Sequence, residues 1–403
     1  MSKRDNKEKF LDSFYYLPLF WIATGMFWFS GGDKTLVAFV LVSAIVSLLR
    51  NGLRTIIDNW NNGYWLKIVF TYATYVVVSY YYYDFGSREL RASLVALVYL
   101  ATLPRASLSF QRFKWIVLLA SINCLAISTY YQFIVPTERI LWPVNAIPFA
   151  TFSALVALVA LGCTRREKNT IWKVVLFVSF CAATVGAILT QTRGIIVSLA
   201  VVLPIVAIYI CMSYQSIKKR WLALIGVALF LSGYASAPLL EKRVTQTFNE
   251  IANIQRGNME TSIGLRLSMY QNAIDISAEK PVFGHGKQLQ PYIDGLLDDK
   301  KISRQVHHFM SMNFHSGYLE KLVVSGVIGL ALMLLVLLYP LVLSIKNRSC
   351  EWSVCATGAV SLVYILANIT DTPFTNGHSF VSYLIFIGVA IYIPSTPRSR
   401  GET

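Results

Sequence analysis

Charged residues are scarce in this sequence. They make up 14% of its 403 residues, against about 25% in soluble domains. In their place, apolar runs of 17 or more residues recur along the chain, and each is long enough to cross about 30 Å of hydrocarbon as a helix. So little polar sequence separates these runs that an aqueous domain of any size must come from the one long polar interval described below. The composition predicts an all-α, polytopic bundle of transmembrane helices.

Cysteines and paired carboxylates are also few. The six cysteines lie in apolar runs or beside basic loops, and no CxxC or Cys/His spacing of a zinc site occurs. The short loops predicted below to face outward hold no DxD motif, and the adjacent Asp298 and Asp299 are followed by lysines, as in a solvated turn. A disulfide framework and a metal site are therefore not expected, and no cofactor is predicted.

Twelve membrane spans are predicted from the apolar runs. Pro104 and Pro204 end or interrupt the fourth and the eighth, and proline is tolerated in a membrane helix where neighbouring groups satisfy the freed backbone. The predicted spans are 14–30, 35–50, 66–83, 90–104, 114–135, 141–163, 172–190, 194–213, 221–238, 317–344, 352–369 and 378–394.

The basic residues predict the orientation of these spans. The net charge is +15, but the basic residues do not form one patch along the sequence, so nucleic acid is not an expected partner. Loops on one side carry 21 lysines and arginines, and the short loops on the other side carry five. Because cytoplasmic loops are enriched in lysine and arginine, both termini are predicted to be cytoplasmic. No cleavage signal follows the first apolar run, so it should remain as an anchor.

One long polar interval, 241–314, interrupts the apolar pattern and falls on the outer side. It divides the chain into spans one to nine (1–238), a periplasmic loop domain (239–316), and spans ten to twelve with a short cytoplasmic tail (317–403). Apolar residues at helical spacing predict an amphipathic helix from about Ser262 to Glu279, stopped by Pro281. A turn is expected at 281–286, and 287–313 is expected to be irregular or weakly helical.

Span ten opens with small residues that would let another helix approach closely, namely Ser325, Gly326 and Gly329.

Two arginines are candidates for binding an anion on the outer side. Arg193 lies in the turn between spans seven and eight, where it could snorkel to headgroups or meet an anionic ligand. Arg266 lies one turn from Tyr270 on the amphipathic helix, where it could be a solvated charge or could grip phosphate oxygens with its planar fork.

The histidines give one candidate general base. His315 stands where the polar interval meets span ten, and its near-neutral pKa suits a base, although an interfacial structural role is the alternative. His307 and His308 are expected to be solvated, His285 to fill a turn, and His378 to anchor span twelve at the interface. Asp371, in the last outer turn, either caps a helix or orients an arginine or a histidine.

Three motifs occur in order on the predicted outer side, and together they resemble the O-antigen ligase and polymerase superfamily. They are Gln191-Thr-Arg193-Gly; Gly264-Leu-Arg266-Leu-Ser-Met-Tyr270 followed by Pro281-Val-Phe-Gly-His-Gly286; and His315-Ser-Gly-Tyr-Leu-Glu with Gly326-Val-Ile-Gly-Leu330. The motifs cover about residues 190–330. Ser316 stands where the family often has asparagine, which bears on the role of that position.

The resemblance implies a metal-independent, inverting glycosyltransferase of the GT-C type in the inner membrane of a Gram-negative bacterium. It would transfer O-antigen from undecaprenyl diphosphate to a sugar hydroxyl of lipid A–core, in contact with membrane lipids and with its active site facing the periplasm. By the motif match, Arg193 and Arg266 would hold the donor diphosphate and His315 would act as base, supported by Tyr270 and Asp371.

Three alternatives stay open at this point. An O-antigen polymerase shares the motifs and differs in its acceptor, which would be another lipid-linked glycan. A glycolipid transporter belongs to a different class and should carry charged residues within several spans. Here the spans are almost free of charge, which argues against transport. A non-catalytic scaffold would leave both arginines unexplained. The oligomeric state is not predicted.

Overall fold

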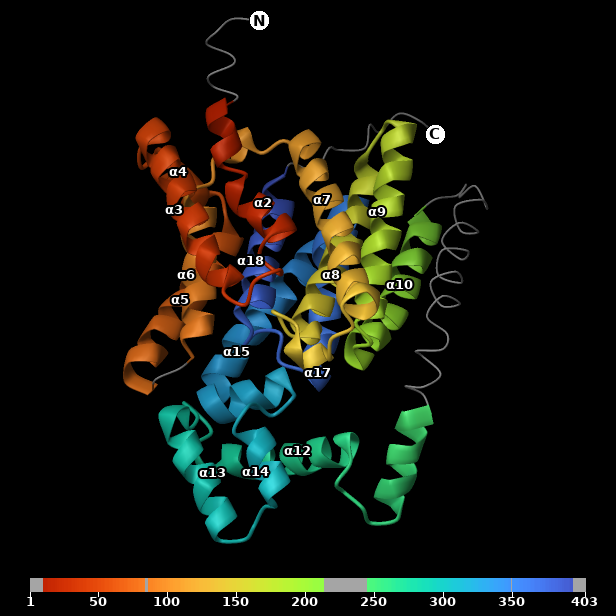
Figure 1. Cartoon of the computed structure of the whole chain (residues 1–403). Coiled ribbons are helices and arrows are strands. Elements are labelled where there is room, and N and C mark those ends of the chain that lie inside the picture. The colour runs from red at the N-terminus through yellow and green to blue at the C-terminus, as the bar shows by residue number, and fades with distance from the viewer. Residues whose placement is uncertain (1–9, 84–85, 214–244, 349, 394–403) are drawn as a thin grey trace, which may run out of the picture.

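The computed structural model describes residues 10–83, 86–213, 245–348 and 350–393, and the regular elements in these ranges are all helical (Figure 1). The predicted all-α bundle is therefore confirmed. The main helices are α2 (Leu17–Thr24), α3 (Gly32–Asn51), α4 (Arg54–Asn61), α5 (Tyr64–Tyr83), α6 (Ser87–Thr102), α7 (Phe110–Thr129), α8 (Ala146–Arg166), α9 (Thr170–Leu189), α10 (Arg193–Ser213), α12 (Ser262–Glu279), α13 (Leu289–Asp298), α14 (Arg304–Met310), α15 (Gly317–Lys346), α16 (Glu351–Ser353), α17 (Val360–Thr370) and α18 (Gly377–Tyr392).

Seven helices are long and apolar enough to cross a membrane. They are α3, α7 with the π-helical turn that follows it (Tyr130–Ile134), α8, α9, α10, α15, and the continuous helix Glu351–Thr370, which ends in α17. Helices α5, α6 and α18 match three further predicted spans but are not among the seven. The ninth predicted span, 221–238, lies outside the described residues.

The first predicted span, 14–30, does not form one spanning helix. Helix α2 has eight residues and covers only about 12 Å at 1.5 Å per residue. The chain turns after it: the backbone N–H groups of Gly25 and Met26 both donate to the carbonyl of Trp21, and the Trp21 indole donates to the carbonyl of Gly32 at 2.8 Å. The prediction of a span at 14–30 is wrong because its apolar residues pack inside the bundle around a turn.

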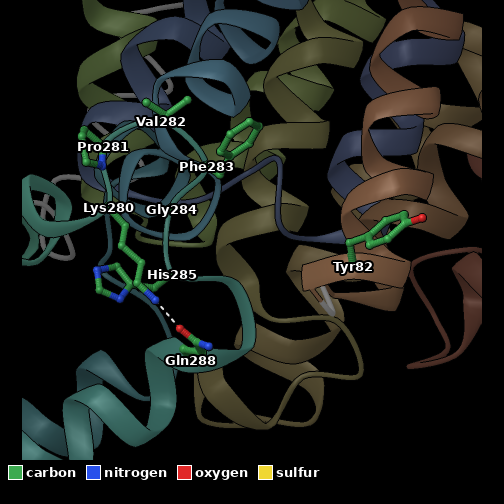
Figure 2. Close-up of a pocket in the computed structure, with 8 residues that line it drawn as sticks. All are labelled: Tyr82, Lys280, Pro281, Val282, Phe283, Gly284, His285 and Gln288. Carbon is green, nitrogen blue, oxygen red and sulfur yellow. Dashed lines mark hydrogen bonds between the residues drawn. The ribbon is translucent and has the colours of Figure 1, made fainter.

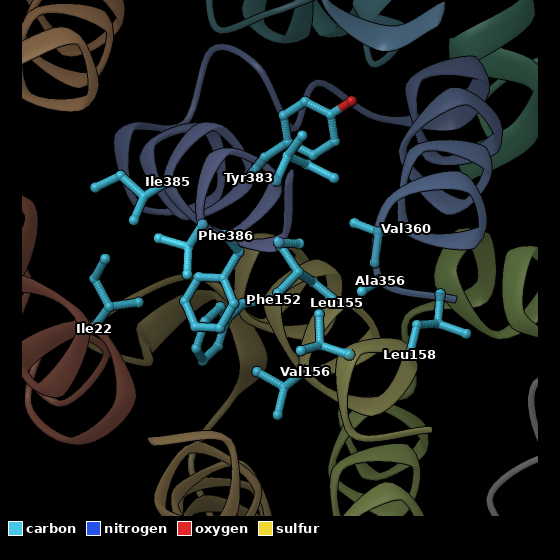
Figure 3. Close-up of a cluster of buried hydrophobic side chains, with 14 of the residues drawn as sticks. Ile22, Phe152, Leu155, Val156, Leu158, Ala356, Val360, Tyr383, Ile385 and Phe386 are labelled. Atoms are coloured by element: carbon cyan, nitrogen blue, oxygen red, sulfur yellow. The ribbon is translucent and has the colours of Figure 1, made fainter. Parts of the chain in front are cut away.

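Helix α8 forms the centre of the bundle. Almost all of its residues are buried, and alanines along it allow close packing of the surrounding helices. Figure 3 shows side chains of α8 such as Phe152 and Leu155 beside Phe386 of α18 and Val360 of α17. The Phe152 ring also stacks on that of Phe27, with centroids 4.3 Å apart. Elements from both ends of the chain therefore share one apolar core.

The polar interval folds into a small helical domain at one end of the bundle (Figure 1). Helix α12 has the predicted bounds, and the Thr261 hydroxyl accepts a hydrogen bond from the Gly264 N–H at its start. The prediction that 287–313 is irregular or weakly helical is wrong, since α13 and α14 lie in this range. Their apolar residues pack on α12 in a separate core that includes Met269, Ile276, Ile293, Val306, Met310 and Phe314.

Helix α15 is broken at Gly326, and the loop after α12 fills the break. Gly326 has a φ of +63°, a left-handed conformation that glycine adopts without steric cost. The Val327 N–H donates to the Pro281 carbonyl at 2.8 Å, and the His285 N–H donates to the Val323 carbonyl at 2.8 Å. The small residue predicted to admit a neighbouring helix instead admits a loop, and that loop joins the polar domain to α15.

Candidate functional site

The predicted site residues meet where four helices end or pass. The N–H of Gly317, at the start of α15, donates to the Asp371 carbonyl after α17 at 2.8 Å. A Cβ on Gly194 would lie 2.4 Å from the Thr370 hydroxyl, so the start of α10 touches the end of α17. The Tyr270 hydroxyl of α12 donates to the carbonyls of His315, at 3.0 Å, and of Ile369, at 3.3 Å. The motifs therefore converge although more than 100 residues separate them.

His315 is held in an unusual backbone conformation. Its φ is +51°, which is uncommon for a residue other than glycine and is found at functional sites. Its N–H donates to the Asn313 side chain at 2.9 Å, and Tyr270 binds its carbonyl. The imidazole is therefore positioned through its own backbone, on the turn that leads from the polar domain into α15.

The His315 ring has one nitrogen that no described residue binds. Its Nδ1 atom is buried and has no hydrogen-bond partner among the described residues. Burial and the nearby charge of Arg266 lower the pKa of His315 to about 4. The ring is therefore neutral at pH 7, as a general base must be before it accepts a proton.

Arg266 is a half-buried cation without a fixed partner. Its guanidinium forms no hydrogen bond or ion pair with the part of the chain that the structure describes. Its charge nevertheless acts on His315, Tyr270 and Asp371. Because a half-buried charge is usually paired, this position suits an anionic ligand.

Arg193 lies at the first position of α10 and faces the helical residues 245–255. Its guanidinium bonds the Glu250 carboxylate at 3.2 and 3.3 Å and the Gln246 amide at 3.5 Å. The other Glu250 oxygen accepts from the Ile263 N–H near the start of α12, at 3.1 Å. Glu250 thus ties Arg193 to the helix that carries Arg266.

Asp371 follows α17 and supports the site with its backbone and its side chain. Its carbonyl accepts from Gly317, and its carboxylate accepts from the N–H of Thr372 at 2.8 Å. Burial raises the pKa of Asp371 to about 6, partly offset by that hydrogen bond and by the charges of Arg266 and Arg139. Asp371 thus occupies the C-terminal cap position of α17 and lies within the electrostatic reach of two arginines.

Residues 176–334 match the family model described as O-antigen ligase. An uncharacterized protein of Haemophilus influenzae is 27% identical over 256 residues, which cover 60% of this chain and 62% of that protein. The match thus spans less than two thirds of the relative's length.

The segment 176–334 is thus similar to the O-antigen ligase family. Together with the seven apolar helices of spanning length, this match indicates a multi-pass membrane protein. The matched segment contains Arg193, Arg266, Tyr270 and His315. Asp371 lies beyond it and joins the others only through the packing of α17 on α10 and α15.

The structure adds two residues to this site that sequence reasoning missed. Arg139 donates a hydrogen bond to the Thr192 hydroxyl at 3.3 Å, and its charge lowers the pKa of Asp371. In the sequence it counted only as one of the five cations of the outer loops. Glu250 pairs with Arg193. No periodic pattern marks either residue. A π-helical turn just before Arg139 is a feature enriched at functional sites, but it is visible only in the structure.

The other histidines lie outside this cluster. His285 is buried, and its Nε2 lies 2.9 Å from the Ile276 carbonyl, so it joins the loop to α12 rather than merely filling a turn. His307 bonds the Asp294 carboxylate at 2.8 Å, while His308 is exposed and its ring lies beside Phe309. His378 lies at the start of α18, 3.8 Å from the Asp33 carboxylate.

A separate cavity of about 520 Å³ opens between Tyr82 of α5 and the loop 280–285 (Figure 2). The Lys280 ammonium bonds the Gln288 side chain across its floor. The side chains of Val282 and Phe283 are half exposed here. Arg193, Arg266 and His315 do not line this cavity, so it is distinct from the converging motifs.

Within the four described ranges, no group of three or more histidine, cysteine or carboxylate side chains is placed to share a metal ion. The side chains that converge are instead two arginines, a third arginine beside them, a neutral imidazole and a carboxyl group. This set can bind an anion and move a proton, which are the two functions a phosphate leaving group and a hydroxyl nucleophile require.

Proposed function

We propose that this protein is an O-antigen ligase. It would transfer a glycan from undecaprenyl diphosphate to a sugar hydroxyl of lipid A–core, with inversion and without a metal ion. The observation that carries the proposal is the convergence of Arg193, Arg266 and His315 where α10, α12 and the start of α15 meet, beside the polar domain.

Arg193 and Arg266 would bind the donor diphosphate. When the sugar–phosphate bond breaks, negative charge grows on the departing diphosphate, and fixed cations in a site of low dielectric stabilise it. Arg266 supports this role because its half-buried guanidinium has no partner among the described residues. For Arg193, the phosphate would share or replace the contact with Glu250.

His315 would act as the general base on the acceptor hydroxyl. A sugar hydroxyl is a weak nucleophile, and a positioned base typically contributes 10²–10⁴-fold. The neutral ring would take the hydroxyl proton as the oxygen attacks the anomeric carbon from the face opposite the diphosphate. Tyr270 and Asp371 would support this step by holding the backbone of residues 315 and 317.

The same proposal places the protein in its membrane. The excess of basic residues in one set of loops supports cytoplasmic termini and a polar domain in the periplasm. The donor, the lipid A–core acceptor and the surrounding membrane lipids would then all reach the site from the outer leaflet of a Gram-negative inner membrane.

A reaction with purified components tests the proposal. The protein is mixed with lipid-linked O-antigen and lipid A–core, and the products are resolved on a gel. A ligase yields glycan joined to core, with equal yield in the presence of EDTA. Growth of the lipid-linked glycan in the absence of core would instead identify an O-antigen polymerase. Strong inhibition by EDTA would contradict the metal-independent step.

A further inference from the structure

A second cavity lies directly beside the His315 turn. It encloses about 350 Å³ between the start of α6, the start of α15 and the loops before α15 and α18, within the roughly 300–1,000 Å³ typical of ligand pockets. None of the arginines placed at the proposed donor site lines it. In Figure 1, α6 and α10 lie on opposite sides of α15.

The walls of this cavity hold the backbone around His315. Asn313 lines the cavity, and its side-chain oxygen accepts from the His315 N–H at 2.9 Å. Glu320 also lines it, and its carboxylate accepts from the Phe314 N–H at 2.9 Å. A molecule bound here would contact the same side chains that set the position of the proposed base.

The chemistry of the lining is mixed. At its base, Lys321 pairs with the Glu89 carboxylate, which also accepts from the Tyr72 hydroxyl. Both charged side chains are less than a tenth exposed, so the pair is fixed and close to neutral. Around it, the lining adds the Glu320 carboxylate, the Asn313 amide, the exposed Arg88 guanidinium, and the hydroxyls of Ser87 and Thr375.

This combination matches a sugar better than it matches an acyl chain or an isolated anion. A sugar offers both donors and acceptors on neighbouring hydroxyls, and the lining supplies carboxylate, amide, hydroxyl and guanidinium groups within one cavity. Met312 and Val324 add apolar surface on which the C–H face of a sugar ring can pack. An acyl chain would leave these polar groups without partners, at a cost in free energy.

His315 itself does not line this cavity, but Asn313 and Glu320, which hold the backbone on its N-terminal side, do. We propose that this cavity is the acceptor site, and that it binds the terminal sugar of a lipid-anchored glycan beside the turn that carries His315. The proposal rests on the proposed function. It assigns the acceptor to a cavity that neither Arg193 nor Arg266 lines, so donor and acceptor would occupy different sites. The same sugar chemistry could come from lipid A–core or from a second lipid-linked glycan.

Filling the cavity tests this assignment. Ser87 is exposed at the first position of α6 and lines the cavity, so Ser87→Trp adds bulk there without touching Arg193, Arg266 or His315. The matched control is Thr35→Trp, at an exposed position in the first turn of α3 that lines none of the described cavities. Each purified variant is assayed with lipid-linked donor and with either lipid A–core or a second lipid-linked glycan as acceptor.

The expected result for Ser87→Trp is an acceptor KM raised roughly tenfold or more, in the range of a single lost pocket contact. Thermal stabilisation by undecaprenyl diphosphate should stay unchanged, and Thr35→Trp should behave as wild type. The acceptor whose KM rises identifies the source of the sugar. If Ser87→Trp does not fold, Arg88→Ala, at an exposed lining position, should raise the same KM.

Two outcomes separate this inference from the proposed function. If the wild-type protein transfers glycan but the folded cavity variants keep acceptor KM values within about twofold of wild type, the acceptor assignment is overturned alone. If the wild-type protein transfers glycan to neither acceptor, the proposed function fails and the acceptor site fails with it.

Discussion

At the scale of single residues, the proposed role of Arg266 can be tested directly by substitution. It lies half-buried beside His315 and Asp371, and its guanidinium has no hydrogen-bond partner in the described part of the chain. A planar guanidinium can give two parallel hydrogen bonds to phosphate oxygens, whereas a lysine ammonium is a point charge. Transfer activity should therefore depend on the arginine side chain itself, and not only on its positive charge.

We expect Arg266→Lys to lose most transfer activity, by about tenfold or more for a lost charge-assisted contact. The control is Arg256→Lys, at an exposed arginine of the same domain, which should keep wild-type activity. Initial rates of transfer from lipid-linked donor measure both. Full activity in Arg266→Lys would show that Arg266 is a surface charge.

Asp371 gives the site a predicted pH dependence. Burial raises its pKa to about 6, while burial and Arg266 lower the pKa of His315 to about 4. As pH falls, Asp371 should therefore gain its proton first and His315 second. Between about pH 4 and pH 6, His315 is still neutral, but Asp371 is protonated and no longer carries its negative charge.

If the ionised Asp371 is needed, kcat/KM for the donor should fall below about pH 6. The Asp371→Asn variant should be less active at pH 7 and should lack this step, keeping only the later fall near the His315 pKa of about 4. Rates measured from pH 4 to 8 decide the matter. An unchanged profile in Asp371→Asn would remove Asp371 from the mechanism.

At the scale of elements, the broken helix α15 couples the polar domain to the bundle. A Cβ on Gly326 would lie 2.2 Å from the Val282 carbonyl oxygen, and the residue has a φ of +63°. The loop 281–285 can lie in the break only because the chain carries no side chain there. His315 is on the same helix, so the seating of this loop also positions the site.

We expect Gly326→Ala to destabilise the protein by at least about 1–2 kcal/mol, the cost of a left-handed conformation for a residue with a Cβ, with more from the contact with Val282. Gly295→Ala is the matched control, because a Cβ at this α13 position meets nothing within 4 Å. Thermal unfolding in detergent measures both. Equal midpoints for the two variants would contradict this account of the α15 break.

Sequence patterns predicted those elements whose signals are local. The apolar stripe and Pro281 together predicted α12 at its observed bounds. The same reasoning failed at 14–30, where an apolar run of spanning length turns back inside the bundle, and at Gly326, where a small residue admits a loop instead of a helix. In both cases the outcome depends on which distant segment packs against the residue.

At the scale of the whole molecule, the central prediction is the orientation in the membrane. Arg139 contacts Thr192 beside the site, and α8, which begins soon after it, has 21 residues and spans about 31 Å. Lys168, just past the end of α8, should thus lie on the opposite side of the membrane from the polar domain.

A labelling experiment tests this orientation in a background without native cysteines. Asn258→Cys, at an exposed position of the polar domain, should react with a membrane-impermeant maleimide in intact spheroplasts. Lys168→Cys, exposed in the turn between α8 and α9, should react only after the membrane is permeabilised. Reaction of Lys168→Cys in intact cells would reverse the topology.

The site as a whole was only partly predictable from the sequence. The three ordered motifs identified Arg193, Arg266 and His315 as candidates, because each residue lies in a recognisable local sequence pattern. Arg139 and Glu250 have no such pattern, and they reach the site through the packing of the 139–141 turn on Thr192 and of residues 245–255 on α10. Contacts of that kind depend on the tertiary fold and leave no periodic signal.

The most direct test of the account is transfer by a purified protein that lacks the His315 imidazole. His315→Ala and His315→Asn are compared with His308→Ala, which changes an exposed histidine of the same domain. Asparagine tolerates the left-handed backbone of residue 315, so it separates loss of the base from loss of the turn. The account predicts that both His315 variants bind undecaprenyl diphosphate normally but form no core-linked product, while His308→Ala forms it at the wild-type rate. Near-normal transfer by either His315 variant would contradict it.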